Sequence, residues 1–227
     1  MYDFVFVLMP KYMPFLLGGA ITTIQISVLS MACAIVIGLT VALGRLSRMR
    51  VLRAVLATYV EIWRNVPLIV QLLVIYFSLP QIGVSLPGFW AGVLGLSLNV
   101  GAYLSEVFRA AILSVDAGQK DAGLSIGMSR IMIYRRVILP QALRIAIPTI
   151  GGYFIALLKD SALVSYIAVN ELLRHGTIVI SNTFKSMEIY IMVAIIYFVI
   201  SFICARIVGY MERSLTPAYL RAQLAQS

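Results

Sequence analysis

Four charged side chains lie inside stretches of sequence that are otherwise apolar. Glu106 and Arg109 interrupt one such stretch, and Lys159 and Asp160 interrupt another. Charges within a membrane are costly, so they usually mark a pathway for a polar substrate or ion, or pair with one another. Glu106 and Asp160 are therefore candidates for a substrate pathway. Their polar neighbours, which add hydrogen-bonding capacity, are Asn99, Tyr103, Ser161 and Ser165.

Pairing within the protein would also account for these charges. Glu106 and Arg109 are three residues apart, so on a helix they share a face and can neutralise each other. Asp160 can be matched by a basic neighbour such as Lys159. The residue types leave both a pathway role and a pairing role open for each carboxylate.

The two carboxylates are expected at a similar depth. Glu106 lies ten residues before Asp116, which is ~15 Å of helix from the inner boundary. Asp160 lies twelve residues beyond Pro148, or ~18 Å by the same rise. Because the two spans run in opposite directions, both side chains fall near mid-depth, where transporters place their substrate sites.

The elements that position these residues are predicted to be membrane helices. Of the 227 residues, 61% are hydrophobic and 12% are charged, with a mean hydropathy of +0.97, whereas soluble domains have about 25% charged residues. The apolar runs are continuous rather than alternating, which indicates helices. We therefore predict an all-α integral membrane protein with a single domain over residues 1–227.

Five spans account for the apolar runs, each reaching the ~20 residues that a membrane requires. They are predicted at about residues 13–43, 56–79, 89–113, 146–166 and 188–207. Pro67 interrupts the second, and Glu61 and Arg64 in its first turns are spaced to pair. Residues 114–145 form a charged loop, and the less regular stretch at 161–187 is expected to be partly re-entrant or external.

The basic residues predict the orientation of the spans. Four arginines follow the first span, five basic residues lie in the 114–145 loop, and three arginines follow the last span. Only Lys11, Arg174 and Lys185 fall on the other side. By the positive-inside rule the N-terminus is outside and the C-terminus is cytoplasmic.

Several kinds of chemistry have no residues to support them. The sequence contains no G-x-x-x-x-G-K-[ST] loop, so we expect no ATP bound by that device, and no G-x-S-x-G motif. His175 is the single histidine, and Cys33 and Cys204 lack metal-ligand spacing, so neither a metal nor another cofactor is expected in this chain.

The net charge of +9 is explained by the basic residues on the cytoplasmic side and does not indicate nucleic-acid binding. The first residues have no basic n-region, so the first span is expected to remain as an anchor.

The charged loop carries the most specific motif. From Gly118 to Pro148 it reads GQKDAGLSIGMSRIMIYRRVILPQALRIAIP. This stretch resembles the EAA loop of bacterial ABC-importer permeases, in which E-A-A is followed after three residues by Gly and after nine more by I-x-L-P. The matching positions are Asp121, Ala122, Gly123, Gly127, Val137, Leu139 and Pro140. Asp in place of Glu and Gly in place of the second Ala are mild departures.

Other stretches are similar to the polar amino-acid branch of that family. They are RNVPLIVQL (Arg64 to Leu72), YLSEVFRAAI (Tyr103 to Ile112) and LLKDSALVS (Leu157 to Ser165). A narrower similarity, in GLSLNVGAYLSE and ISNTF, is to permeases of the cystine and glutamine group.

The resemblance implies a permease subunit of an ATP-driven importer in the bacterial cytoplasmic (inner) membrane. A short helix around Asp121 to Gly127 would lie in a groove on a separate ATPase dimer, which would hold ATP and Mg²⁺. A periplasmic or extracellular binding protein would deliver a polar amino acid, and a second permease would complete the pathway. The basic residues of the loop could pair with the ATPase or with anionic lipid headgroups.

A gradient-driven carrier or channel that uses Glu106 and Asp160 as ion ligands is the alternative function. It gives no account of the charged loop. The substrate also stays open: a basic amino acid is favoured if both carboxylates meet it, and a neutral or acidic one fits if one of them is paired with Arg109 or Lys159.

Overall fold

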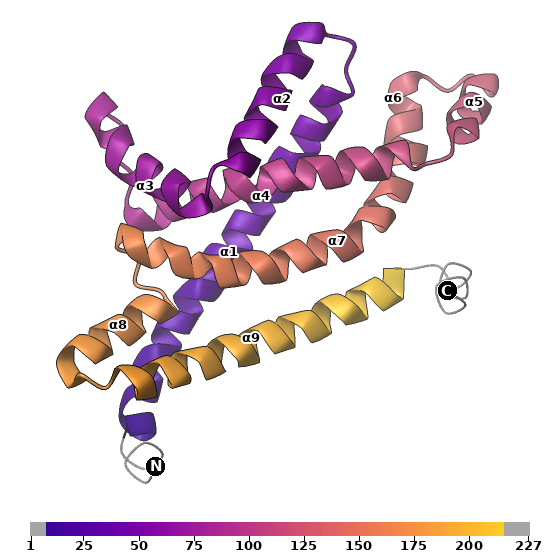
Figure 1. The fold of residues 1–227 in the computed structure, drawn as a ribbon. Coiled ribbons are helices and arrows are strands. Elements are labelled where there is room, and N and C mark those ends of the chain that lie inside the picture. The colour runs from indigo at the N-terminus through magenta and orange to yellow at the C-terminus, as the bar shows by residue number, and fades with distance from the viewer. Residues whose placement is uncertain (1–7, 216–227) are drawn as a thin grey trace.

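The long helices after residue 87 run side by side, the long first helix crosses them diagonally, and smaller helices extend from this body (Figure 1). The structure is a computed structural model and describes residues 8–215. Within that range the regular structure is entirely helical, as predicted. The longest elements are α1 (Met9–Arg45), α4 (Gly88–Leu113), α7 (Leu139–Asp160) and α9 (Ser186–Leu215).

Helix α4 lies at the centre of the fold and packs closely against α1. A Cβ added to Gly38 of α1 would lie 2.8 Å from the Cβ of Leu104, and one added to Gly101 would lie 2.8 Å from Cγ2 of Ile37. Glycine at both positions therefore lets the two helix backbones approach, as small residues do in membrane proteins. The Ser97 hydroxyl adds a hydrogen bond to the Ser30 carbonyl oxygen at 3.2 Å.

The second predicted span is a pair of helices with a sharp bend. Helix α2 (Arg50–Asn65) is followed by α3 (Leu68–Ser78) and a 3₁₀ turn, η2 (Leu79–Ile82), and the helix direction changes by 107° between the two parts. Pro67 explains the break, because it has no N–H to continue the helix and pushes the preceding residue toward an extended conformation. Val66 has that conformation, with φ −90° and ψ 134°.

Four helices among the described residues are long and apolar enough to cross a membrane, or five if the bent pair is one span. The helix that contains the predicted fourth span begins well before residue 146. It runs from Arg130 to Ile167 through α6 (Arg130–Ile133), a π-helical segment η3 (Tyr134–Ile138), α7, and a 3₁₀ segment η4 (Ser161–Ile167). The basic residues of this stretch concealed its helical character in the sequence.

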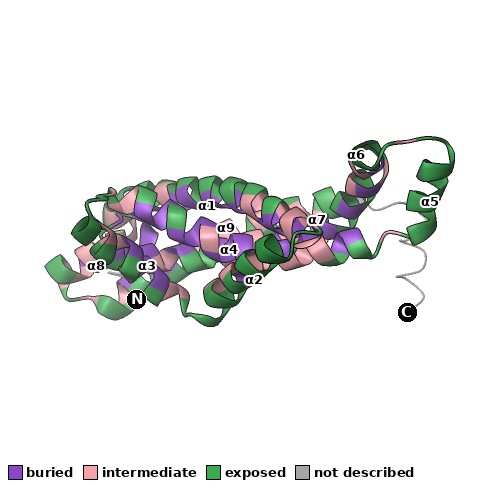
Figure 2. Cartoon of the chain, turned by 90° about the horizontal axis from the view of Figure 1, so that it is seen from above, coloured by how far each residue is buried: buried purple, intermediate pink, exposed green. Residues whose placement is uncertain are grey.

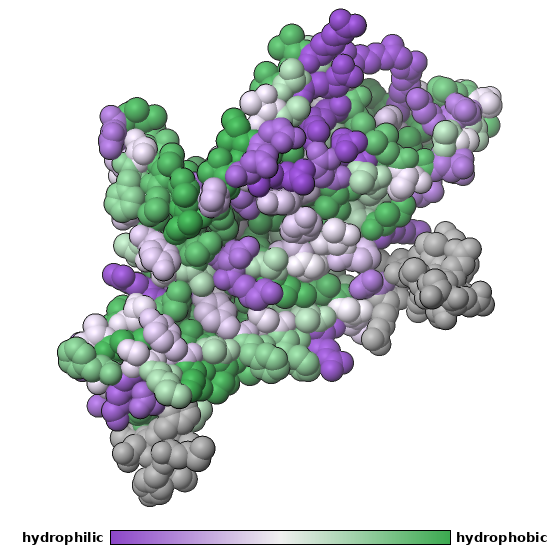
Figure 3. All heavy atoms as spheres, in the orientation of Figure 1, coloured by the Kyte–Doolittle hydropathy of each residue, from purple (hydrophilic) through white to green (hydrophobic). Residues whose placement is uncertain are grey.

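Residues 114–145 are therefore mostly helical rather than an open loop. They contain α5 (Ala117–Ser125), α6, η3 and the first turns of α7. In Figure 2, α5 and α6 project beyond the body of the protein at one end and are largely exposed. Figure 3 shows hydrophilic residues gathered over α2, the α1–α2 turn and α5, and hydrophobic residues over much of α3.

A buried glutamate fixes the segment that precedes α9. Glu171 is the N-cap of α8 (Leu172–Thr183) and has no exposed surface. Its carboxylate accepts hydrogen bonds from the backbone N–H groups of Leu173 at 2.9 Å and Arg174 at 2.8 Å, and from the Tyr197 hydroxyl at 2.7 Å. Burial raises the pKa of Glu171 above its ordinary value even though these hydrogen bonds lower it.

Candidate functional site

The break between α2 and α3 leaves backbone carbonyl groups without helical partners, and side chains of neighbouring helices bind them. The Gln71 side-chain amide donates to the Trp63 carbonyl at 2.9 Å and to the Val66 carbonyl at 2.8 Å. Asn99 of α4 donates to the same Trp63 carbonyl at 2.9 Å and to the Gln71 side-chain oxygen at 3.0 Å. Gln71 and Asn99 are both buried. Together they hold the bend in place.

Tyr103 of α4 supports the next residue of the break. Its hydroxyl donates to the Arg64 carbonyl oxygen at 3.2 Å, and the Arg64 guanidinium lies over the Tyr103 ring, 5.3 Å from the ring centre. The Tyr103 ring also packs against Tyr153 of α7, with ring centres 5.7 Å apart. A cation over an aromatic ring is an electrostatically favourable pair. The ring therefore orients Arg64, which has no acidic partner within residues 8–215.

A polar cleft of about 370 Å³ opens at this break, between α2, α4 and α7. Its polar lining residues are Arg64, Asn65, Asn99, Tyr103, Tyr153 and Asp160. Asp160 is exposed and makes no hydrogen bond or ion pair with the described residues, although Lys159 is adjacent to it in the chain. The cleft thus contains one guanidinium and one carboxylate that do not pair with each other.

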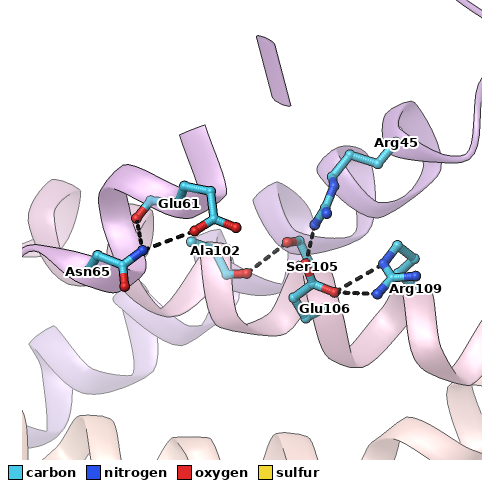
Figure 4. A network of polar contacts seen from close by, with 7 residues as sticks. All are labelled: Arg45, Glu61, Asn65, Ala102, Ser105, Glu106 and Arg109. Carbon is cyan, nitrogen blue, oxygen red and sulfur yellow. Dashed lines mark hydrogen bonds and ion pairs between the residues drawn. The ribbon is translucent and has the colours of Figure 1, made fainter. Parts of the chain in front are cut away.

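Three of the six predicted pathway residues, Asn99, Tyr103 and Asp160, meet in this cleft, whereas Glu106 lies outside its lining. The Glu106 carboxylate is held by Arg45 at the end of α1 and by Arg109, whose Nη2 is 2.7 Å from it (Figure 4). The predicted pair of Glu106 and Arg109 is therefore present. Arg45 is the additional partner, which the sequence placed in the cytoplasmic turn.

Ser161 and Ser165 also lie outside the lining of the cleft. Both are buried, and each hydroxyl donates to a carbonyl three residues earlier, on Leu158 and Ala162, at 2.7 Å. These hydroxyls cap turns of their own helical segment, where α7 changes to η4.

Gln71, Arg64 and Asn65 are residues of this region that the sequence did not identify as part of the site. Glu61 and Arg64, which are spaced to pair, form no ion pair with each other: Glu61 instead accepts a hydrogen bond from the Asn65 side chain at 3.0 Å (Figure 4). Pro67 was the available signal, because discontinuous membrane helices place free carbonyl groups and polar side chains around a binding site.

The segment after α4 contains the predicted coupling residues and is built around a tightly capped helix. The Asp116 carboxylate accepts a hydrogen bond from the Gly118 N–H at 2.7 Å and so caps the start of α5. At the other end, the Gly127 N–H donates to Leu124 O and the Met128 N–H donates to Gly123 O, both at 3.0 Å. This is a Schellman motif. It requires the left-handed conformation that Gly127 adopts, with φ of 79°.

Gly123 fixes how α5 lies on α6. A Cβ at Gly123 would lie 2.8 Å from Cγ1 of Ile133, so glycine lets the two short helices touch. Asp121 and Ala122 lie beside it on the exposed part of α5. Leu139 and Pro140 begin α7 directly after the π-helical segment, whose wider turn accommodates a proline that has no N–H to donate.

The family and the relatives of this chain agree with this architecture. The model of the family described as binding-protein-dependent transport system inner membrane component matches residues 34–217. The L-cystine transport system permease protein TcyB of Bacillus subtilis is 43% identical over 206 residues, which cover 90% of this chain and 88% of TcyB. The glutamine transport system permease protein GlnP of Escherichia coli is 38% identical over 202 residues, which cover 88% of this chain and 92% of GlnP.

Solved structures show the same fold. The crystal structure of an amino acid ABC transporter with histidines superimposes with a TM-score of 0.85 at 40% identity, over 92% of this chain and 98% of that chain. A structure of the methionine ABC transporter MetNI, in an inward-facing conformation, superimposes with a TM-score of 0.75 at 22% identity, over 90% of this chain and 98% of that chain. The chain therefore belongs to the binding-protein-dependent transport system inner membrane components, the permeases of ABC importers, and is a transport subunit rather than an enzyme.

Proposed function

We propose that this chain forms the translocation pathway of an ABC importer for a polar amino acid in the bacterial cytoplasmic membrane. Two similar permeases carry names that specify cystine and glutamine transport, which supports this class of substrate. The single observation that carries the proposal is the polar cleft, where Arg64 and Asp160 lie unpaired beside a broken helix.

The cleft suits the two charges that every amino acid carries. In this proposal Arg64 binds the substrate carboxylate and Asp160 binds its ammonium group. Asn99 and Tyr103 hold the carbonyl groups of the break and so keep Arg64 in position. Glu106 stays paired with its two arginines, and Ser161 and Ser165 stabilise the end of α7. A basic amino acid would be favoured if two carboxylates met the substrate. Because the cleft contains only the carboxylate of Asp160 among its lining residues, neutral, acidic and basic amino acids all fit this proposal.

The bent pair α2–α3 is the second of five spans in this proposal. The N-terminus is outside and the C-terminus is cytoplasmic, because twelve of the eighteen basic residues then lie on the inside. The segment with α5 and α6 lies on the cytoplasmic side, where an ATPase can reach it.

Coupling to the ATPase takes place through α5 and its flanking turns. We assign this role to Asp121, Ala122, Gly123 and Gly127, with Leu139 and Pro140 connecting the segment to α7. Closure of an ATPase dimer on ATP and Mg²⁺ would push two such segments together and rock two permeases, identical or paralogous, from inward-facing to outward-facing. A binding protein would then deliver the amino acid from outside.

Reconstitution in proteoliposomes tests the function. The permease, its ATPase and its binding protein are combined, and uptake of radiolabelled lysine, glutamine, glutamate and cystine is measured with internal ATP. We expect ATP-dependent uptake of at least one of them, and no ATP hydrolysis by the permease alone. Robust hydrolysis by this chain alone, or uptake driven by an ion gradient without the ATPase, would contradict the proposal and favour a carrier.

Asp160→Asn tests the cleft in the same assay. The substitution removes the charge and preserves the size of the side chain, so uptake should fall at least about tenfold, as expected when a charge-assisted contact is lost. Glu188→Gln is a matched control, because Glu188 lies in the first turn of α9 outside the cleft. Unchanged uptake of all four amino acids by Asp160→Asn would remove Asp160 from the substrate site.

A further inference from the structure

A basic cavity lies where the end of α1 meets the segment with α5 and α6. It has a volume of about 340 Å³ and is lined by Leu43, Leu46, Ser47, Arg48, Lys120, Arg130 and Tyr134. Three of these side chains are cations and none is an acid. Arg48, Lys120 and Arg130 form no ion pair with the described residues. Three like charges around one cavity repel one another, so an anion bound there would stabilise the arrangement.

An uncompensated hydroxyl group belongs to the same lining. The Ser47 side-chain oxygen is buried and has no hydrogen-bond partner among the described residues. A buried polar group without a partner costs about 1–3 kcal/mol. An anionic oxygen in the cavity would accept its hydrogen bond.

The cavity faces the permease itself rather than the surface of α5 that is free to meet an ATPase. Lys120 is three residues before Gly123, so the two share a face of α5. Gly123 is buried and its backbone packs against Ile133 of α6. This face of α5 is therefore directed toward the chain's own helices. An acidic segment of a partner protein would reach the opposite face of α5 first.

The position and the apolar lining indicate which anion fits. The last residue of α1 is Arg45, so the cavity lies at one end of a helix that is long and apolar enough to cross a membrane. In the proposed topology this is the cytoplasmic end, on the side of the inner-leaflet headgroups. Leu43 and Leu46 provide an apolar side, and Tyr134 belongs to a residue type enriched at the membrane interface. Basic pockets on the cytoplasmic side of membrane proteins bind anionic headgroups.

We propose that this cavity binds the phosphate of an anionic phospholipid from the inner leaflet, and that the lipid ties the end of α1 to the coupling helix α5. Arg48 and Ser47 would contact the phosphate from the α1–α2 turn, and Lys120 and Arg130 would contact it from α5 and α6. The inference rests on the proposed topology, but not on the identity of the transported amino acid.

Lipid binding to the purified full-length permease tests the proposal. Native mass spectrometry would follow titrations with short-chain phosphatidylglycerol, phosphatidylcholine and inorganic phosphate. We expect saturable binding of phosphatidylglycerol that weakens as salt is added, and little binding of phosphatidylcholine. Equal binding of both lipids would overturn the proposal. Binding of phosphate alone as tightly as phosphatidylglycerol would show that the source is the free ion and not the lipid.

A pair of double variants with equal charge isolates the cavity. Arg48→Gln with Lys120→Gln removes two lining cations, whereas Arg53→Gln with Arg144→Gln removes two basic residues outside the lining. The first should weaken phosphatidylglycerol binding at least about tenfold, and the second less than about threefold. Equal weakening would show non-specific attraction and contradict the proposal.

The buried Ser47 hydroxyl and the ATPase complex supply two further tests of the cavity. Ser47→Ala should weaken phosphatidylglycerol binding by a smaller factor without changing any charge, and no change would remove Ser47 from the site.

The same lipid titration on the complex with the ATPase distinguishes a bound lipid from a bound partner protein. Loss of phosphatidylglycerol binding in that complex would show that ATPase side chains fill the cavity, and would overturn the lipid assignment while leaving the transport function untouched.

Discussion

Single side chains stabilise the broken helix beside the polar cleft. The bend at Pro67 exposes carbonyl groups that a continuous helix would satisfy, and Gln71 satisfies two of them while also accepting from Asn99. The shape of the cleft therefore depends on a residue that has no charge and lies outside the cleft lining.

Gln71→Leu tests this dependence. Leucine has a similar size but leaves the Trp63 and Val66 carbonyl groups with fewer partners, so we expect a loss of about 2 kcal/mol in the free energy of unfolding. Gln141→Leu is the control, because Gln141 is exposed and bonds only within its own helix, to Val137. Thermal unfolding in detergent measures both variants. A Gln71→Leu protein as stable as the control would show that the hydrogen bonds of Gln71 do not stabilise the bend between α2 and α3.

The raised pKa of Glu171 predicts how the stability of the protein depends on pH. Because burial raises the pKa of this carboxyl in the folded protein, the folded state binds the proton more tightly than the unfolded state does. Its contribution to stability is therefore fully present below the unfolded-state pKa of about 4.3 and is lost as the pH rises through the folded-state pKa.

Glu171→Gln should make the unfolding temperature depend less on pH. The single carbonyl oxygen of glutamine can still accept from the Arg174 N–H, and its NH2 group can donate to the Tyr197 oxygen, so the fold should be retained even though the hydrogen bond from the Leu173 N–H is lost. Thermal unfolding between pH 5 and pH 8 checks this. The wild type should lose more stability over that range than the variant, and identical slopes would contradict the prediction.

At the scale of elements, α5 acts as a rigid projection and not as a flexible loop. Asp116 caps its start, the Schellman motif at Gly127 caps its end, and Gly123 seats it on α6. A force applied to α5 would thus pass through Ile133 and the π-helical segment into α7, which reaches the polar cleft through Tyr153 and Asp160.

Gly123→Val tests this mechanical connection. The added side chain would overlap Ile133, and overpacking of this kind costs about 1–3 kcal/mol. We expect uptake in the reconstituted system to fall while the permease remains folded. Combining the change with Ile133→Ala makes room for the valine and should restore part of the uptake. If the double variant is no better than Gly123→Val, the contact with Ile133 is not what matters.

The sequence predicted the all-helical class, because this depends on local composition. It could not predict that Arg64 would lie over Tyr103 or that Arg45 would join Glu106, because these contacts join helices far apart in the chain. It also could not predict that the hydroxyls of Ser161 and Ser165 would bond to their own helical backbone. A hydroxyl in a helix can bond its own backbone, and only the packing decides whether it does so.

At the scale of the whole molecule, the bent pair α2–α3 determines the topology. If the pair crosses the membrane, the α1–α2 turn and the turn after η2 lie on opposite sides. If it enters and returns as a re-entrant loop, both lie on the same side, and every later helix reverses its direction. The proposed position of α5 on the cytoplasmic side requires the crossing.

Cysteine accessibility decides between these topologies. Cys33 and Cys204 are first replaced by alanine, and single cysteines are introduced at Met49, Val84 and Ile126, which are 66%, 48% and 78% exposed. In right-side-out spheroplasts, a membrane-impermeant maleimide should label Val84→Cys, and it should label Met49→Cys and Ile126→Cys only after permeabilisation. Protection of Val84→Cys together with Met49→Cys would identify a re-entrant pair. Labelling of Met49→Cys and Ile126→Cys in intact spheroplasts, with Val84→Cys protected, would invert the protein and place α5 beyond the reach of a cytoplasmic ATPase.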